Sequence, residues 1–152
     1  MKRQTQDKVV MVVSAVSFFL NMLLINTRPS VVKELIVVGY VILAVGAFLF
    51  ILSMITLRRK GISQVIDSGI YSIVRHPMYL GGMIMFFSHA FFGQNWILIM
   101  STVVGIGCCY LLMLSGDQRN IDKFGEDYLR YMKRVPRMNF ASGLARLIHK
   151  AN

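Results

Sequence analysis

Long apolar segments alternate with short polar ones along most of this chain. A membrane-spanning helix needs about 20 mostly apolar residues, with roughly 17 to 25 acceptable. Three segments reach that length, at residues 9–25, 35–57 and 96–114. We expect a fourth span over residues 78–92, which begins inside the membrane interface at Pro77. Residues 93–95 (Gly-Gln-Asn) then predict a tight polar turn, so the last two spans form an antiparallel hairpin.

The second predicted span carries small residues on one stripe. Gly39, Gly46 and Ser53 recur every seven residues. Small residues on one face let neighbouring helices approach closely inside a membrane, where association depends on packing. The stripe therefore predicts a helix-helix contact and requires no further function.

The pattern changes after Leu114. Asp117, Ile121, Phe124, Tyr128 and Tyr131 follow the period of one helix face. They predict an amphipathic helix over residues 117–132 that lies along the membrane surface or folds back over the bundle and is ended by Pro136.

The basic, partly apolar stretch at residues 141–150 is typical of an interfacial anchor. The expected fold is therefore all-α. It is a single domain over residues 1–152, an integral membrane bundle of four transmembrane helices followed by a cytoplasmic helical tail at residues 117–150.

Composition supports this interpretation. Hydrophobic residues make up 55% of the chain and charged residues 16%, and the mean hydropathy is +0.57. Seventeen Lys and Arg face seven Asp and Glu, a formal net charge of +10. The basic residues lie between apolar segments, so membrane lipid headgroups are expected as partners. In the tail these residues follow a helical period, so no nucleic acid is expected as a partner.

The basic residues also predict an orientation. With four spans and a cytoplasmic N-terminus, every Lys and Arg except Arg28 and Lys33 falls on the cytoplasmic side. Short cytoplasmic loops carry such an excess, so we expect both termini in the cytoplasm. A signal peptide at residues 9–25 is the competing reading, but the segment is long and no A-x-A cleavage site follows it.

Candidate chemistry concentrates in residues 67–82, between two spans. This segment contains Tyr71, Arg75, His76 and Tyr79. A proline such as Pro77 suits the first turn of a helix, where unpaired backbone N–H groups favour an anion. Arg75, His76 and these amides could therefore hold a ligand carboxylate or phosphate. Alternatively, Arg75 is a headgroup contact and His76 an accidental cap.

An ordered set of motifs resembles a known family. Gly69-x-Tyr71-x-x-x-Arg75-His76-Pro77-x-Tyr79 precedes the apolar hairpin, and Lys123-Phe124-Gly125-x-x-Tyr128-x-x-Tyr131 with Val135-Pro136-Arg137 follows it. Over roughly residues 60–140 the chain is similar to the integral-membrane methyltransferases of the isoprenylcysteine carboxyl methyltransferase and phospholipid methyltransferase group.

The resemblance implies that S-adenosylmethionine binds at the cytoplasmic face and that a lipophilic acceptor reaches the methyl group from the bilayer. It also implies cofactor contacts from four residues, Tyr71, His76, Pro77 and Tyr79.

The chain departs from the family at one place. The family commonly has two glutamates some seven residues before the Phe-Gly step, with an Arg one turn earlier. Here Gly116 and Asp117 stand in place of the pair and Met113 in place of the Arg. Asp117 can supply one carboxylate, for the cofactor amino group or a ribose hydroxyl. An acceptor carboxylate would need a cationic partner, for which Arg75 and Arg119 are the candidate catalytic residues.

Methyl transfer fits these residue types. A sulfonium donor is already activated, so alignment and a dry site matter most and no metal is expected. Tyrosines can form aromatic walls around the cofactor, and we include Tyr128 among its contacts, although Tyr128 and Tyr131 could equally be ordinary interfacial residues. The acceptor expected is a lipid-like carboxylate, amine or hydroxyl. The alternative is a non-catalytic carrier or assembly subunit that keeps the fold.

His89 stands apart from these motifs. An ionisable group within a span is by default a functional candidate that faces the bundle. It lies about 15 Å beyond Tyr79 along a helix, at 1.5 Å per residue. We therefore expect His89 near the opposite interface, away from the cofactor.

Overall fold

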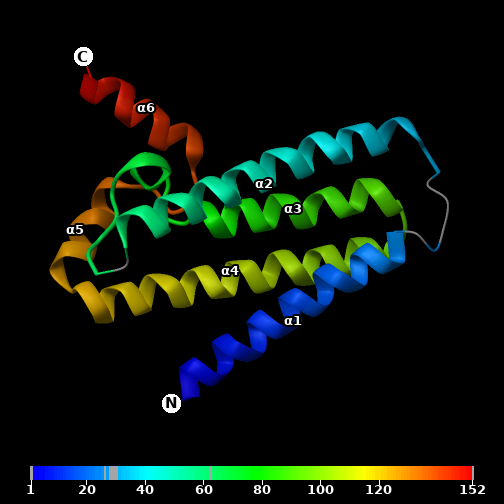
Figure 1. The fold of residues 1–152 in the computed structure, drawn as a ribbon, viewed down its shortest axis with the longest axis horizontal. Coiled ribbons are helices and arrows are strands. Elements are labelled where there is room, and N and C mark those ends of the chain that lie inside the picture. Colours follow the sequence, from blue (N-terminus) through cyan, green and yellow to red (C-terminus); the bar gives the residue numbers. More distant parts are fainter. Residues whose placement is uncertain (1, 26, 28–30, 62, 152) are drawn as a thin grey trace.

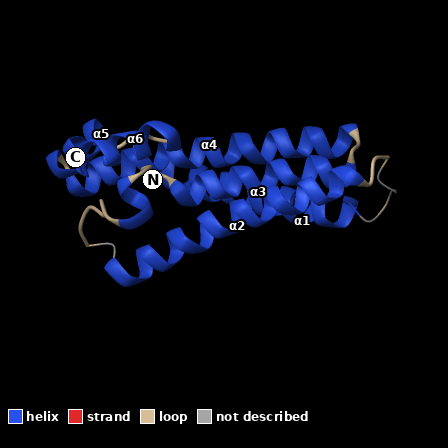
Figure 2. Cartoon of the chain, turned by 90° about the horizontal axis from the view of Figure 1, so that it is seen from above, coloured by secondary structure: helices blue, strands red, loops and turns tan. Residues whose placement is uncertain are grey.

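The computed structural model describes the chain except for residues 1, 26, 28–30, 62 and 152. The described residues form helices and loops without a strand (Figure 2), which confirms the expected all-α class. The elements, in chain order, are α1 (Lys2–Ile25), α2 (Glu34–Lys60), the 3-10 helix η1 (Gly69–Ser72), α3 (Pro77–Gly93), α4 (Trp96–Phe124), α5 (Glu126–Arg134) and α6 (Phe140–Ala151).

Four long helices lie side by side (Figure 1). α3 packs between α2 and α4, and α1 packs mainly against α4. η1, α5 and α6 gather where α2 and α4 end and α3 begins, and this end of the bundle is called the α5 end below. In Figure 2, α2 leans away from the other long helices toward the α5 end.

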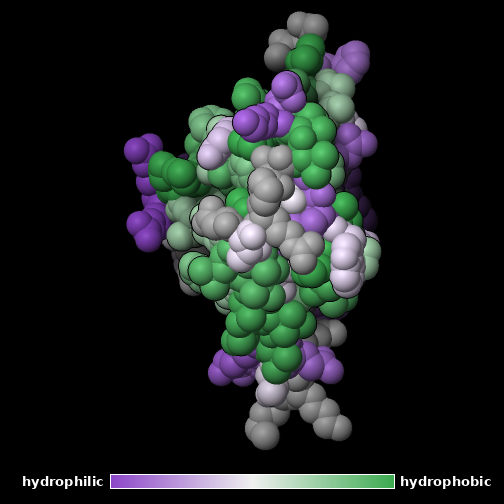
Figure 3. Space-filling model, turned by 90° about the vertical axis from the view of Figure 1, so that its right-hand side faces the viewer, coloured by the Kyte–Doolittle hydropathy of each residue, from purple (hydrophilic) through white to green (hydrophobic). Residues whose placement is uncertain are grey.

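Three of these helices are long and apolar enough to cross a membrane, namely α1 from Gln4, α2 and α4. Many large apolar side chains on α1 and α2 are exposed, and much of the surface seen from the end opposite α5 is apolar (Figure 3). α3 is equally apolar but has 17 residues, a length of about 25 Å against a hydrocarbon core of about 30 Å. The fourth span therefore stays a prediction.

The stripe of small residues on α2 faces its neighbour, as its spacing predicts. Gly39, Gly46 and Ser53 are all buried. A Cβ on Gly46 would lie 2.8 Å from the backbone oxygen of Gly81 on α3. Two helices can approach this closely only where neither carries a side chain.

The boundaries of the α3–α4 hairpin are also as expected. Pro77 occupies the first turn of α3, and Gln94 ends the helix in the left-handed conformation with φ of 44°. Asn95 caps α4 through a hydrogen bond from Leu98 N to its side chain, at 3.1 Å. The Gln94 side chain also bonds both backbone groups of Val32, which fastens the turn to the start of α2.

The predicted helix boundary near residue 115 is wrong. α4 continues unbroken from the apolar segment through Asp117 to Phe124, and the chain turns only at Gly125, where φ is 54°. Ser115 through Phe124 contains no proline, and its buried face packs against the bundle, so nothing interrupts the helix. The expected amphipathic helix at residues 117–132 is therefore the end of α4 followed by the short α5.

Candidate active site

Asp117 is a buried carboxylate on α4 that four side chains approach. Its Oδ1 accepts hydrogen bonds from His76 Nε2 and from the Tyr128 hydroxyl, each at 2.7 Å, and Arg75 NH1 lies 3.3 Å away. Its Oδ2 accepts a hydrogen bond from Arg137 Nε at 2.9 Å. An ionised carboxylate only accepts hydrogen bonds, so His76 carries a proton on Nε2. These five residues are called the Asp117 cluster.

The cluster forms because the parts of the chain that surround Asp117 are tied to one another. The backbone N–H of Arg75 donates to the oxygen of Pro136 at 3.0 Å, which joins the start of α3 to the segment after α5. The buried hydroxyl of Tyr131 donates to the backbone oxygen of Tyr71 at 2.6 Å, which joins α5 to η1. Asp117 therefore meets its partners at fixed positions.

A cavity of about 450 Å³ opens beside the cluster, and it is called the polar cavity because Arg75, Arg119 and Lys123 line it together with tyrosine and apolar side chains. It lies between the C-terminal ends of α2 and α4, η1 and α5. Its lining residues are Leu57, Gln64, Val65, Ile66, Tyr71, Arg75, Arg119, Asn120, Lys123, Phe124, Tyr128 and Tyr131. The volume falls in the range of about 300 to 1,000 Å³ that is usual for cofactor sites.

One lining residue has an unused donor. Arg75 Nε is buried and has no hydrogen-bond partner within the described part of the chain. A buried, unpaired N–H of a charged group is costly unless a ligand or water pairs with it. Arg75 as a whole lines the cavity, and its guanidinium is the kind of group that would pair with the carboxylate of an amino-acid moiety such as that of S-adenosylmethionine.

A second space, an apolar groove of about 420 Å³, has Tyr79 among its lining residues. α1, α2, α3 and α4 all contribute to it. Its lining residues are Met11, Ser14, Ala15, Phe18, Phe19, Phe50, Met78, Tyr79, Gly82, Met85, Phe86, Cys109 and Leu112. Such a surface suits a hydrocarbon chain.

The polar cavity and the apolar groove share no lining residue, but Arg119 of the cavity and Tyr79 of the groove are in contact, and this contact is called the junction below. Arg119 lines the cavity, Tyr79 lines the groove, and Arg119 NH2 lies 3.4 Å from the Tyr79 hydroxyl. Gly116 lies directly behind them, and a Cβ there would be 3.5 Å from His76 Cε1 and 3.6 Å from Tyr79 Cε2. The junction is therefore bordered by the side chains of Arg119, Tyr79 and His76 and by the backbone of α4 at Gly116.

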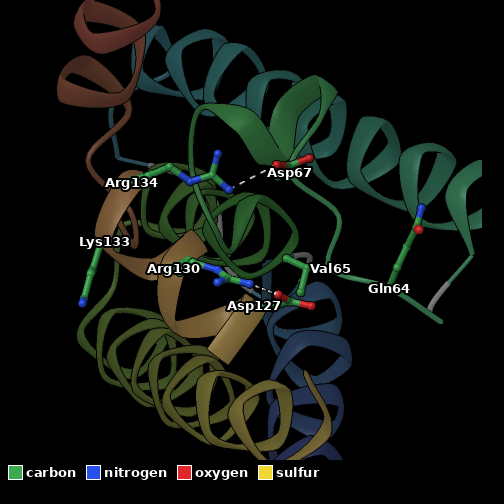
Figure 4. Close-up of a pocket in the computed structure, with 7 residues that line it drawn as sticks. All are labelled: Gln64, Val65, Asp67, Asp127, Arg130, Lys133 and Arg134. Atoms are coloured by element: carbon green, nitrogen blue, oxygen red, sulfur yellow. Dashed lines mark hydrogen bonds and ion pairs between the residues drawn. The ribbon is translucent and has the colours of Figure 1, made fainter. Parts of the chain in front are cut away.

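A charged pocket of about 640 Å³ lies further out, between α5 and the segment before η1 (Figure 4). The ion pair between Arg134 and Asp67 crosses it, Arg130 pairs with Asp127 along α5, and Lys133 points away. None of the residues of the Asp117 cluster lines this pocket. We therefore place the candidate site in the polar cavity.

The tyrosines around the cavity are held in their protonated form. Burial, and secondarily the charge of Tyr79, raises the pKa of Tyr71 to about 12. Burial also raises the pKa values of Tyr128 and Tyr131. Their hydroxyls therefore remain hydrogen-bond donors at neutral pH.

The structure distributes the predicted site residues over these features. Tyr71, Arg75, Arg119 and Tyr128 line the polar cavity, and Arg75, His76, Asp117 and Tyr128 belong to the cluster. Tyr79 lines the apolar groove, and Pro77 begins α3 behind His76.

The sequence analysis gave no role to three other residues at the site. Arg137 pairs with Asp117, and Asp7 and Ser115 contact each other beside Arg119. Arg137 belongs to the quoted Val-Pro-Arg motif, which was a usable signal. Asp7 is the single acidic residue of α1, and nothing in its neighbours indicated a partner on α4.

His89 lies away from the site, as its spacing predicts, and faces the bundle. Its ring is buried against Phe18 and Phe86, and Asn21 Nδ2 lies 3.2 Å from His89 Nδ1. No cluster of three His, Cys, Asp or Glu side chains suited to a metal occurs among the described residues.

Comparison with known proteins identifies the family. The sequence profile of the phospholipid methyltransferase family matches residues 34–115, from the start of α2 into the last part of α4. No match was found among curated proteins or solved structures. The matched region covers more than half of the 152 residues and includes Arg75, His76 and Tyr79. The chain therefore belongs to the phospholipid methyltransferase family.

Proposed function

We propose that this protein transfers a methyl group from S-adenosylmethionine, held in the polar cavity, to a lipophilic acceptor held in the apolar groove. The observation that carries the proposal is that a cavity with three cationic lining residues, Arg75, Arg119 and Lys123, neighbours an apolar groove, with Arg119 of the first in contact with Tyr79 of the second. A charged donor and an apolar acceptor need such separate compartments, with one point at which they touch.

The polar cavity provides groups for each part of the cofactor. Arg75 brings a guanidinium group that suits its carboxylate, and the rings of Tyr71 and Tyr128 form aromatic walls. When bound, S-adenosylmethionine supplies an activated methyl group on a positively charged sulfur. Asp117 has four partners of its own, so we assign it a positioning role in which it holds Arg75, His76 and Tyr128 in place.

The protein's remaining contribution is alignment and exclusion of water. The groove keeps the acceptor in an apolar environment up to Tyr79, where Arg119 offers a cation to the acceptor's polar head. Holding two reactants in line lowers the entropic part of the barrier, and a dry site strengthens each electrostatic contact. The acceptor class that fits is a membrane lipid with a carboxylate, amine or hydroxyl at its head.

We further propose that α3 spans together with α1, α2 and α4, and that both termini and the site lie on the cytoplasmic side. The side-by-side, antiparallel packing of α3 between α2 and α4 supports four spans, and the basic residues support the orientation (Figure 1). Reporter fusions at each terminus test it, since a periplasmic or extracellular signal from either would overturn it.

Cofactor binding is the direct test of the proposal. Calorimetry on detergent-purified protein should give saturable heat with S-adenosylmethionine and with S-adenosylhomocysteine. Arg75→Gln should weaken both by about tenfold, because it removes a charged donor. No heat from the wild-type protein at millimolar ligand would overturn the proposal and leave the non-catalytic alternative, which family membership does not favour.

The acceptor is best found by mass spectrometry of membrane lipids. Cells with the wild-type protein should contain a lipid heavier by one methylene than in cells without it. Cells with Arg119→Gln should contain less of that lipid. A lipid profile that is the same in all three would contradict methyl transfer to a membrane lipid.

A further inference from the structure

The first turns of α1 contact the catalytic region directly. Asp7 Oδ1 accepts a hydrogen bond from Ser115 Oγ on α4 at 2.5 Å, and its Oδ2 forms an ion pair with Arg119 NH1. The Asp7 side chain is largely buried, with 13% exposed, whereas Arg119 is 46% exposed. Asp7, Arg119 and α1 all lie outside the residues that the family profile matches.

Arg119 needs such a partner because of where it lies. Its guanidinium is at the junction of the polar cavity and the apolar groove, with NH2 3.4 Å from the Tyr79 hydroxyl. Gly116, one turn earlier, has no side chain to support it. An arginine side chain that is nearly half exposed would otherwise sample many rotamers.

Asp7 removes this freedom. It binds NH1, Tyr79 lies next to NH2, and the planar guanidinium is therefore held in one orientation. Ser115 in turn holds the carboxylate through its other oxygen. Arg119 lines the polar cavity and touches the groove only through Tyr79, so the polar head of an acceptor would meet the remaining N–H groups once it extends past Tyr79.

We propose that Asp7 is a positioning residue that holds Arg119 at the junction of the two cavities, so that α1 sets how the acceptor's polar head is received. This inference rests on the proposed methyl transfer and adds a specific role for α1. α1 contributes both the holder of Arg119 and one side of the groove, through Met11, Ala15 and Phe18.

The inference predicts a change in acceptor kinetics without a change in cofactor binding. The assay uses labelled S-adenosylmethionine and mixed micelles of a total membrane-lipid extract. Asp7→Asn should raise the apparent KM for lipid about tenfold, as expected when a hydrogen bond to a charged group is lost. The kcat should change by less than about twofold, because the contact is equally present before and during transfer.

Matched variants separate positioning from structure. Asp7→Glu keeps the charge and should remain within about threefold of the wild type. Asp127→Asn removes a carboxylate that pairs with Arg130 on the exposed surface of α5, and it should change nothing. The Kd for S-adenosylmethionine should stay the same in all three variants.

A double variant tests whether Asp7 acts through Arg119. If it does, Asp7→Asn combined with Arg119→Gln should have the same KM as Arg119→Gln alone. Effects that add would overturn the inference, as would an unchanged KM for Asp7→Asn. Should Asp7→Asn fail to fold, Arg119→Lys carries the same test, because it keeps the charge and loses the planar fork.

Failure of the inference differs from failure of the proposed function. A wild-type protein that neither binds the cofactor nor labels lipid would remove the methyltransferase proposal itself. A wild-type protein that does both, with a KM unaffected by Asp7→Asn, would overturn the positioning role of Asp7 alone.

Discussion

Two groups of buried polar side chains lie toward opposite ends of the long helices, and they differ in charge. At the α5 end, the carboxylate of Asp117 has four donors from three other parts of the chain. At the far end, Asn21 on α1 and His89 on α3 share one hydrogen bond between neutral groups. Along α3, the two groups are about 20 Å apart at 1.5 Å per residue.

The difference follows from what surrounds each group. Asn21 and His89 lie among apolar helices and the rings of Phe18 and Phe86, where a charge would be expensive. Asn21 Oδ1 even lacks a partner in the described part of the chain. The Asp117 cluster lies where loops and α5 cover the helix ends and can supply several donors. The charged site therefore forms at the α5 end, where loops and α5 supply hydrogen-bond donors in addition to the long helices.

Of the four predicted changes, Asp117→Asn should cause the largest loss of stability, and it acts at the α5 end. It removes the charge that pairs with Arg75 and Arg137 and leaves both guanidinium groups facing a neutral amide. Breaking a buried ion pair from one side costs about 3 to 5 kcal/mol, and we expect the lower end because Arg137 is partly exposed. Denaturant unfolding in micelles measures the loss. A stability equal to that of the wild type would show that the cluster is not a structural unit.

His76→Ala should have the next largest effect. It removes one hydrogen bond to the carboxylate but leaves both arginines, so we expect a loss of about 1.5 to 3 kcal/mol at most. Calorimetry should show weaker S-adenosylmethionine binding, since His76 helps to place Asp117 and the start of α3. Unchanged S-adenosylmethionine binding would show that the Asp117 cluster does not contribute to the cofactor site.

Alkaline pH should weaken the α5 end selectively. The pKa of Tyr71 is raised to about 12, so the folded state holds its proton more tightly than the unfolded chain does. This contribution to stability is complete below pH 10 and is lost as the pH rises from about 10 toward 12. Thermal unfolding across this range checks it. A stability that rises with pH in this window would contradict the assignment.

Replacement of Asn21 and His89 should change stability least. Asn21→Leu combined with His89→Phe exchanges both partners of a neutral hydrogen bond for apolar groups, which should change stability by less than about 1 kcal/mol. Cofactor binding should be unaffected, and the alkaline loss of stability should persist. A binding defect as large as that of Asp117→Asn would instead place His89 in the functional machinery.

The sequence allowed much of the site to be anticipated, but not its geometry. Tyr71 and Tyr128 were predicted to contact the cofactor and Arg75 and Arg119 to pair with the acceptor, and all four line the polar cavity. The other predicted cofactor contacts, His76, Pro77, Tyr79 and Asp117, do not line it. The chemistry of the four lining side chains and the order of their motifs were enough to predict them. Their pairing was not foreseen, because Arg75 and Asp117 are separated by 42 positions and meet only after α3 and α4 have packed.

Local properties of the chain dictated the elements of the fold. Hydropathy selected the long helices, Pro77 and residues 93–95 set the ends of α3, and the small residues of α2 chose the face that packs on it. Each depends on neighbours within a few positions, so it can be read without knowing the fold.

The packing of the helices against one another decided the remaining features of the fold and the site. Hydropathy ended the last span at Leu114, whereas α4 continues to Phe124, with Gly116 and Asp117 buried on its inner face and the turn delayed to Gly125. The same packing brought Asp7 to Arg119, more than a hundred residues away in the chain. Such contacts depend on the relative placement of whole helices, and no local pattern in the sequence contains that information.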